Sequence, residues 1–270
     1  MMLKLLNNRA LVLYFFPFFL GLLSVFSFQP YNFTILNFFI LSSLFYLIVY
    51  IKKKSKNIYR KKPYRKNLFI FGTLFGFGYY LSGIYWINYS LTFDENFRIL
   101  IPFSLILIPL FLSLFFSIVI LLAGPLLNYN LSSIFLLSGC LAFSDFLKSK
   151  ILTGFPWNLW AYSFSWATEI IQTLNILGMF SFNLICITLF MLPAYLFAKV
   201  SVKNKSILLI NMILVFFLLY LFGNLSINQN KNHIKTINEK YYIKVISPNF
   251  DLEYGLQTED IERRLEKLVR

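Results

Sequence analysis

Seven apolar stretches dominate the 270-residue sequence and constrain its fold more than any other feature. A helix needs about 20 residues to cross the hydrocarbon core of a bilayer. Because unpaired backbone groups are costly in lipid, segments of this kind are expected to be helical. The spans are expected at about residues 11–28, 33–51, 68–89, 99–123, 131–147, 170–198 and 207–223. The sequence therefore predicts an all-α polytopic membrane domain of seven transmembrane helices over residues 1–223.

The positions of the basic residues indicate how this domain is oriented. Fourteen Lys and Arg residues fall on the N-terminal side of the membrane, nine of them within residues 52–66, and three fall on the other side before residue 224. Short loops rich in Lys and Arg stay in the cytoplasm. We therefore expect a cytoplasmic N-terminus and an extracytoplasmic segment after residue 223. The basic stretch 52–66 could also bind nucleic acid or anionic lipid, but a cytoplasmic loop is the simpler interpretation, without a nucleic-acid partner.

The composition changes after Gly223. Residues 224–240 are rich in Asn and Lys and are expected to form a polar linker. Residues 241–247 resemble a β-strand, and Thr258 begins a predicted helix with Ile261, Leu265 and Leu268 on one face. Because one strand and one helix cannot bury a core, residues 241–270 are expected to be the start of a larger α/β domain. Later residues or a separate chain would complete it.

The stretch from Asp145 to Tyr162 combines charged, helix-breaking and aromatic residues. Asp145 and Lys148 end the fifth apolar run and lie three residues apart, on one face of a helix. Charges in a membrane helix often have a function. A salt bridge that anchors the helix end, with Lys148 reaching towards the membrane surface, is an equally good interpretation.

Gly154-Phe155-Pro156-Trp157 follows this pair. The aromatic residues from Trp157 to Trp166 could form a belt at the level of the lipid head groups. Alternatively, Gly154 and Pro156 could shape a re-entrant loop that lines a lipid-binding groove. We favour the loop, because a belt needs neither Gly nor Pro. The candidate groove residues are Asp145, Lys148, Gly154, Phe155, Pro156 and Trp157.

Residues 1–270 contain no recognisable catalytic set. The single histidine, His233, lies in the polar segment and is given no role. Cys140 and Cys186 lie inside apolar runs and are expected to be inert packing residues. No metal-ligand spacing and no phosphate-binding loop is present in the sequence, so no metal or cofactor is expected.

The charged pair and the loop together resemble a known signature. Asp145-x-x-Lys148 followed by Thr153-Gly-Phe-Pro-Trp157 is similar to the Glu-x-x-Arg…Thr-Gly-Phe-Pro-Trp signature of bacterial apolipoprotein N-acyltransferases. The resemblance extends over nearly the whole chain. Its other matching residues are Phe28-Gln-Pro30, Gly76, Gly78, Gly83, Trp86, Ile87, Leu174, Gly178 and Ser247-Pro-Asn249.

This resemblance implies a multi-pass enzyme of the bacterial inner (cytoplasmic) membrane, with a periplasmic nitrilase-like domain after residue 223. Enzymes of this family transfer an acyl chain from a phospholipid to the free amino group of a lipoprotein's N-terminal diacylglyceryl-cysteine. The chemistry runs through a thioester on the Cys of a Glu-Lys-Cys triad. The implied partners are therefore a phospholipid donor, a lipoprotein N-terminus as acceptor, and the membrane.

The sequence departs from the family pattern in three respects. None of the triad can be assigned within residues 1–270, so these residues alone are expected to be inactive. Asp145 and Lys148 replace Glu and Arg, which keeps the charges but loses the planar guanidinium. Gly255-Leu256 stand where the family often has Lys-Trp. A transporter or lipid-translocating protein is the alternative, and it is less favoured because no internal repeat is visible.

Overall fold

The computed structural model describes residues 8–56, 63–151, 154–197, 201–236 and 257–269. Within these ranges every regular element is a helix. Six helices are long and apolar enough to cross a membrane: Leu36–Lys54, Tyr64–Thr92, Glu95–Leu126, Leu131–Lys148, Met179–Leu196 and Val202–Thr236. The chain is therefore a multi-pass membrane protein, as the apolar runs predict.

The first apolar run differs from the other six. It consists of η1 (Leu11–Phe15), a π-helical turn, followed by α2 (Phe16–Leu23) and η2 (Ser24–Ser27). These 17 helical residues are at the short end of what a membrane-spanning helix needs. The structure therefore gives six long apolar helices and one shorter one, in place of seven equivalent spans.

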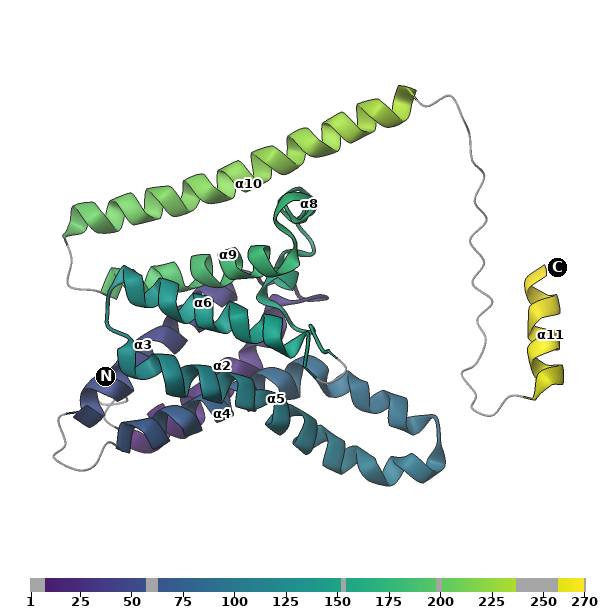
Figure 1. Ribbon diagram of the computed structural model, residues 1–270, viewed down its shortest axis with the longest axis horizontal. Helices are drawn as coiled ribbons and strands as arrows, with labels where there is room; N and C mark the ends of the chain where they lie inside the picture. The colour runs from purple at the N-terminus through teal and green to yellow at the C-terminus, as the bar shows by residue number, and fades with distance from the viewer. Residues whose placement is uncertain (1–7, 57–62, 152–153, 198–200, 237–256, 270) are drawn as a thin grey trace.

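The next three helices are α3 (Leu36–Lys56), α4 (Pro63–Ile84) and α5 (Ile101–Ala123). Two 3-10 segments, η3 (Tyr85–Thr92) and η4 (Glu95–Leu100), connect α4 to α5. This connection projects beyond the neighbouring helices (Figure 1).

Glycines allow α4 to approach α5 closely, as the Gly72-x-x-x-Gly76 spacing predicts. A Cβ atom on Gly72 would lie 2.8 Å from the Cα of Ser117, and one on Gly76 would lie 2.8 Å from the Cα of Ser113. Another glycine of α4, Gly78, lies in the same way against the backbone of α2. The backbone of α4 therefore lies in close contact with the backbones of both α5 and α2.

Five helices form a closed ring around the core. After α5 come α6 (Leu131–Lys148) and α9 (Met179–Met191). Along the ring, α4 contacts α5, α5 contacts α6, α6 contacts α9, α9 contacts α3, and α3 contacts α4. The helix α6 begins at Asn130, whose side chain accepts a hydrogen bond from the backbone N–H of Ser133. The segment that follows α6 enters this ring from one end.

The sixth expected span, residues 170–198, begins later than predicted. Two single helical turns, α7 (Thr168–Ile171) and α8 (Leu174–Leu177), precede Gly178, which has a φ of +72°. This left-handed backbone suits glycine and ends α8. The membrane helix therefore starts at Met179 and continues through the 3-10 segment η7 (Leu192–Phe197).

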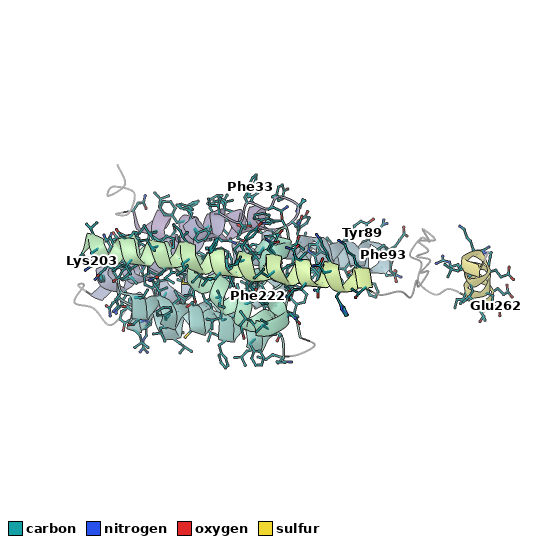
Figure 2. All side chains as sticks on the ribbon, turned by 90° about the horizontal axis from the view of Figure 1, so that it is seen from above. Phe33, Tyr89, Phe93, Lys203, Phe222 and Glu262 are labelled. Carbon is teal, nitrogen blue, oxygen red and sulfur yellow. The ribbon has the colours of Figure 1, made fainter. Side chains whose placement is uncertain are left out.

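The seventh span is much longer than predicted. Helix α10 (Val202–Thr236) has 35 residues and includes residues 224–236, which the sequence suggested were a linker. Residues 224–236 contain no proline, and polar side chains do not end a helix whose backbone is already hydrogen-bonded. The helix runs lengthwise along one side of the bundle, with Lys203 near its beginning (Figure 2).

The structure describes only part of the C-terminal segment. The predicted strand 241–247 and residues 237–240 of the expected linker lie outside the described residues. The predicted helix is present as α11 (Thr258–Val269). Its apolar residues Ile261 and Leu265 are exposed. The start of a nitrilase-like domain therefore remains a prediction.

Substituting Gly72 with Ala should destabilise the protein. The new methyl group would press on the backbone of α5, and overpacking of this kind costs about 1–3 kcal/mol. Thermal unfolding in detergent measures the loss. The matched control is Gly139→Ala in α6, where an added Cβ meets nothing within 4 Å. Equal melting temperatures for the two variants would contradict the close packing of α4 on α5.

Candidate functional site

The segment after α6 turns back into the helix ring without forming a regular helix. Gly154 adopts a φ of +73° and Asn158 a φ of +56°. The backbone N–H of Phe155 donates to the carbonyl of Lys148, 3.1 Å away. The 3-10 segment η6 (Trp160–Phe164) then begins. We call residues 154–161 the re-entrant loop.

Trp160 fixes the inner end of this loop. Its indole is 1% exposed and lies 4.8 Å, between ring centroids, from the ring of Tyr79. Trp157 and Trp166 remain about half exposed. A belt of interfacial aromatics would leave all three rings at the surface, so the geometry agrees with the loop interpretation for Trp160. Thr153 lies outside the described residues.

Lys148 and Asp145 form a buried ion pair beneath the loop. The Lys148 Nζ lies 3.0 Å from Asp145 Oδ1, and the residues are 2% and 8% exposed. The ammonium also donates to Tyr80 Oη at 2.9 Å and to the carbonyl of Trp157 at 3.5 Å. All three of its N–H donors therefore have partners inside the protein. The Lys148 side chain therefore does not reach outwards to the membrane surface.

Asn183, in the middle of α9, completes the network. Its side-chain Nδ2 donates to Asp145 Oδ2 at 2.9 Å, and its Oδ1 accepts from the backbone N–H of Ala161 at 3.1 Å. Asn183 itself is 0% exposed. Both oxygens of the Asp145 carboxylate are thus hydrogen-bonded, which a buried charge requires.

Two tyrosines hold other backbone groups of the loop. Tyr79 donates its hydroxyl hydrogen to the carbonyl of Asn158, and Tyr162 donates to the carbonyl of Pro156 at 3.1 Å. Burial raises the pKa of Tyr162, so its hydroxyl stays protonated and able to donate. Irregular backbone is tolerated within a membrane protein where the surrounding protein satisfies its polar groups. For this loop such partners include Tyr79, Tyr162, Lys148 and Asn183.

An apolar groove of about 420 Å³ runs along the other side of the loop. A volume of several hundred cubic ångströms is typical of sites for small ligands. Lys148 provides the only ionisable side chain, and its ammonium is already fully bonded. The groove therefore offers an almost wholly apolar surface. Its lining residues are Ile87, Leu107, Ile108, Phe111, Leu112, Phe115, Lys148, Ile151, Gly154 and Phe155.

Exposed aromatic rings stand beside Phe155. The rings of Phe155 and Trp157 stack with centroids 6.3 Å apart, and Trp157 lies 5.3 Å from Trp86 of η3. Trp86 and Trp157 are each 46% exposed. This pair joins the loop to the segment that carries Ile87, so the two walls of the groove are in contact there.

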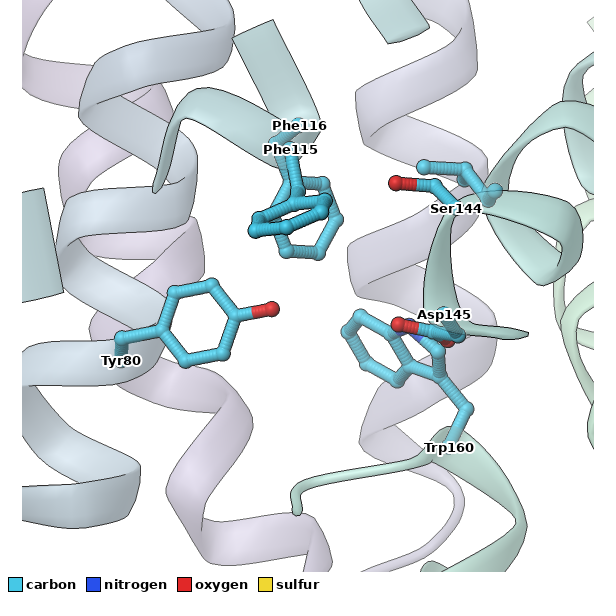
Figure 3. A pocket seen from close by; sticks show the side chains of 7 residues that line it. Tyr80, Phe115, Phe116, Ser144, Asp145 and Trp160 are labelled. Atoms are coloured by element: carbon cyan, nitrogen blue, oxygen red, sulfur yellow. The ribbon is translucent and has the colours of Figure 1, made fainter. Parts of the chain in front are cut away.

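A second, much smaller cavity lies beside Asp145. Its volume is about 10 Å³, roughly what a single water molecule needs. Figure 3 shows the hydroxyl of Tyr80 and the carboxylate of Asp145 facing it from opposite sides, with Phe115 and Phe116 across the top. Asp145 therefore faces this cavity, and Lys148 lines the groove.

The family model described as the apolipoprotein N-acyltransferase N-terminal domain matches residues 20–192, which include the ion pair, the loop and the groove. The chain belongs to this family. Three curated proteins named apolipoprotein N-acyltransferase are similar to it. The one from Rickettsia typhi is 32% identical over 236 residues, covering 86% of this chain and 43% of the relative.

The other two relatives match shorter stretches. The protein from Rickettsia prowazekii is 31% identical over 184 residues, covering 66% of this chain and 35% of the relative. The protein from Rhodopseudomonas palustris is 33% identical over 126 residues, covering 46% and 24%. The chain thus spans less than half the length of these apolipoprotein N-acyltransferases.

The structure brings together some of the residues that the sequence proposed for a groove, and it adds others. Lys148, Gly154 and Phe155 line the groove, Asp145 lies behind it, and Pro156 and Trp157 are exposed beside it. Sequence reasoning did not identify Tyr79, Tyr80 or Asn183. The available signal was a polar side chain inside an apolar run, since such residues in a membrane helix usually pair with one another.

Replacing Lys148 with Met should strongly destabilise the membrane domain. It leaves the Asp145 carboxylate buried without its cation, which typically costs about 3–5 kcal/mol. The double variant Asp145→Asn, Lys148→Met should lose less, because no net charge remains buried. Unfolding in mixed detergent micelles measures both. A double variant no more stable than Lys148→Met would show that the ion pair does not hold the loop.

Proposed function

We propose that this chain is the membrane part of an enzyme that transfers an acyl chain from a phospholipid to the N-terminal amino group of a diacylglyceryl-cysteine lipoprotein. The observation that carries the proposal is that the family model covers both the apolar groove and the loop beside it. In this proposal the groove receives a hydrocarbon chain of the donor phospholipid. The loop sets the shape of the groove, and the reaction itself occurs elsewhere.

The lining of the groove supports a lipid acyl chain as its occupant. Apart from Lys148, the side chains that line it are aliphatic or aromatic. The Lys148 ammonium is fully bonded to Asp145, Tyr80 and the loop, so it has no free donor for a phosphate group. Contacts with the ligand are then mainly apolar, which favours a chain over a polar head group.

The charge distribution supports an orientation with the loop on the periplasmic side of the bacterial inner membrane. Lys52 donates to the carbonyl of Leu127, and Arg9 donates to the side chain of Asn67. The end of α3 and the start of α4 lie at the same end of the bundle (Figure 1), and the bond to Asn67 places Arg9 there too. With that end in the cytoplasm, the loop and Thr236 lie on the periplasmic side.

Residues 1–270 are proposed to lack the reacting groups. Cys140 lies in α6 and Cys186 in α9, and Cys186 is 1% exposed. Cys186 is therefore not accessible as a nucleophile, and Cys140 is half-buried within an apolar helix. The resemblance assigns the thioester-forming Cys, the Glu base and the oxyanion-stabilising Lys to a nitrilase-like domain. That domain would follow in the same protein or be carried by a separate chain.

An acylation assay tests this function. The complete protein, reconstituted in phospholipid vesicles, should convert a diacylglyceryl-cysteine peptide with a free amino group into its N-acylated form, detected by mass spectrometry. A polypeptide limited to residues 1–270 should insert into the vesicles and give no product. No product from the complete protein would refute the proposed function, and product from residues 1–270 would refute the proposed location of the reacting groups.

Filling the groove should impair use of the phospholipid donor. In the complete protein, Leu107→Trp should lower kcat/KM for the donor at least roughly tenfold, the scale on which apolar pockets discriminate between shapes. Ile106→Trp is the matched control, because Ile106 and Leu107 are 55% and 57% exposed and only Leu107 lines the groove. Equal activities for the two variants would exclude the groove as the donor site.

A further inference from the structure

Asn183 connects the ion pair to the far end of the re-entrant loop. Lys148 bonds the carbonyl of Trp157, midway along the loop, and Asn183 bonds the backbone N–H of Ala161 at its end. Between them lies the carboxylate of Asp145, which accepts from Lys148 through Oδ1 and from Asn183 through Oδ2. A continuous chain of hydrogen bonds therefore joins the middle of the loop to its end through the core.

A primary amide is the side chain that fits this place. One of its atoms must donate to a carboxylate and the other must accept from a backbone N–H. An aspartate at position 183 could accept from Ala161, but it would place a second carboxylate 2.9 Å from Asp145. An alanine would leave both Asp145 Oδ2 and the N–H of Ala161 without these partners. A side chain that only filled space would need neither the donor nor the acceptor.

We propose that Asn183 is a positioning residue for acyl transfer. Its amide holds the loop, which forms one wall of the groove, in a fixed position relative to the Asp145–Lys148 pair. This inference rests on the proposed function. Asn183 touches no substrate, because it is fully buried and does not line the groove. It acts through Ala161 and through the carboxylate that orients Lys148.

The first test compares Asn183→Ala with Thr188→Val in the complete protein. Thr188 lies on the same helix, and its hydroxyl bonds Ser138 Oγ across the same pair of helices at 2.9 Å, away from the loop. Asn183→Ala loses two buried hydrogen bonds and Thr188→Val loses one half-buried bond. A purely structural role therefore predicts a lower melting temperature for Asn183→Ala but similar activities per folded protein. A positioning role predicts that kcat/KM for the phospholipid falls at least tenfold in Asn183→Ala and less than twofold in Thr188→Val.

The second test exchanges the two side chains. Asn183→Asp alone brings two carboxylates together and should abolish most activity. In the double variant Asp145→Asn, Asn183→Asp, the amide at position 145 can accept from Lys148 and donate to the carboxylate at 183, which still accepts from Ala161. Every hydrogen bond of the chain is then restored. The double variant should regain at least a third of the wild-type kcat/KM.

The outcomes separate this inference from the function on which it rests. A wild-type protein without acyltransferase activity refutes the proposed function and removes the reaction that Asn183 would serve. With an active wild-type protein, equal activities of Asn183→Ala and Thr188→Val overturn the positioning role. Failure of the exchanged pair to recover, despite a melting temperature equal to the wild type, overturns it as well.

Discussion

One ammonium group determines how the irregular part of this membrane protein is held. Lys148 ends a membrane helix, yet its charge points into the core, where a carboxylate, a phenol and a loop carbonyl take its three hydrogens. A buried charge is tolerated only when its partners replace the water that it has lost. Its partners come from α4, from α6 and from the loop, so the requirement to satisfy one cation fixes three segments relative to one another.

The loop depends on this arrangement because its backbone cannot satisfy itself. A helix in a membrane pairs its own N–H and C=O groups, whereas several backbone groups of residues 154–161 are hydrogen-bonded by side chains. Tyrosine hydroxyls, a lysine and an asparagine perform this role, and each is held by close packing of the helices that carry it. The apolar groove is a consequence, since Gly154 and Phe155 can form a wall only while the loop is held in place.

The sequence predicted the local features of this structure and missed those that depend on distant residues. Apolar runs located the six long helices, and the Gly and Pro after Lys148 indicated an irregular loop. The late start of α9 was missed because Ile170, Ile171 and Leu174 continue the apolar run, while the left-handed backbone at Gly178 interrupts the helix. Tyr80 and Asn183 lie 68 and 38 residues from their partners in the network. Such pairings follow from the packing of helices, which a single sequence does not reveal.

The length of α10 has a mechanical consequence. A 35-residue helix at 1.5 Å per residue is about 52 Å long, well beyond the roughly 30 Å of a hydrocarbon core. The backbone of Gly223 is in close contact with the main chain of Glu169. This contact supports α10 at the point where its apolar part ends. The 13 helical residues after Gly223 extend about 20 Å beyond this contact. The continuous helix therefore sets both the distance and the direction of Thr236 from this contact.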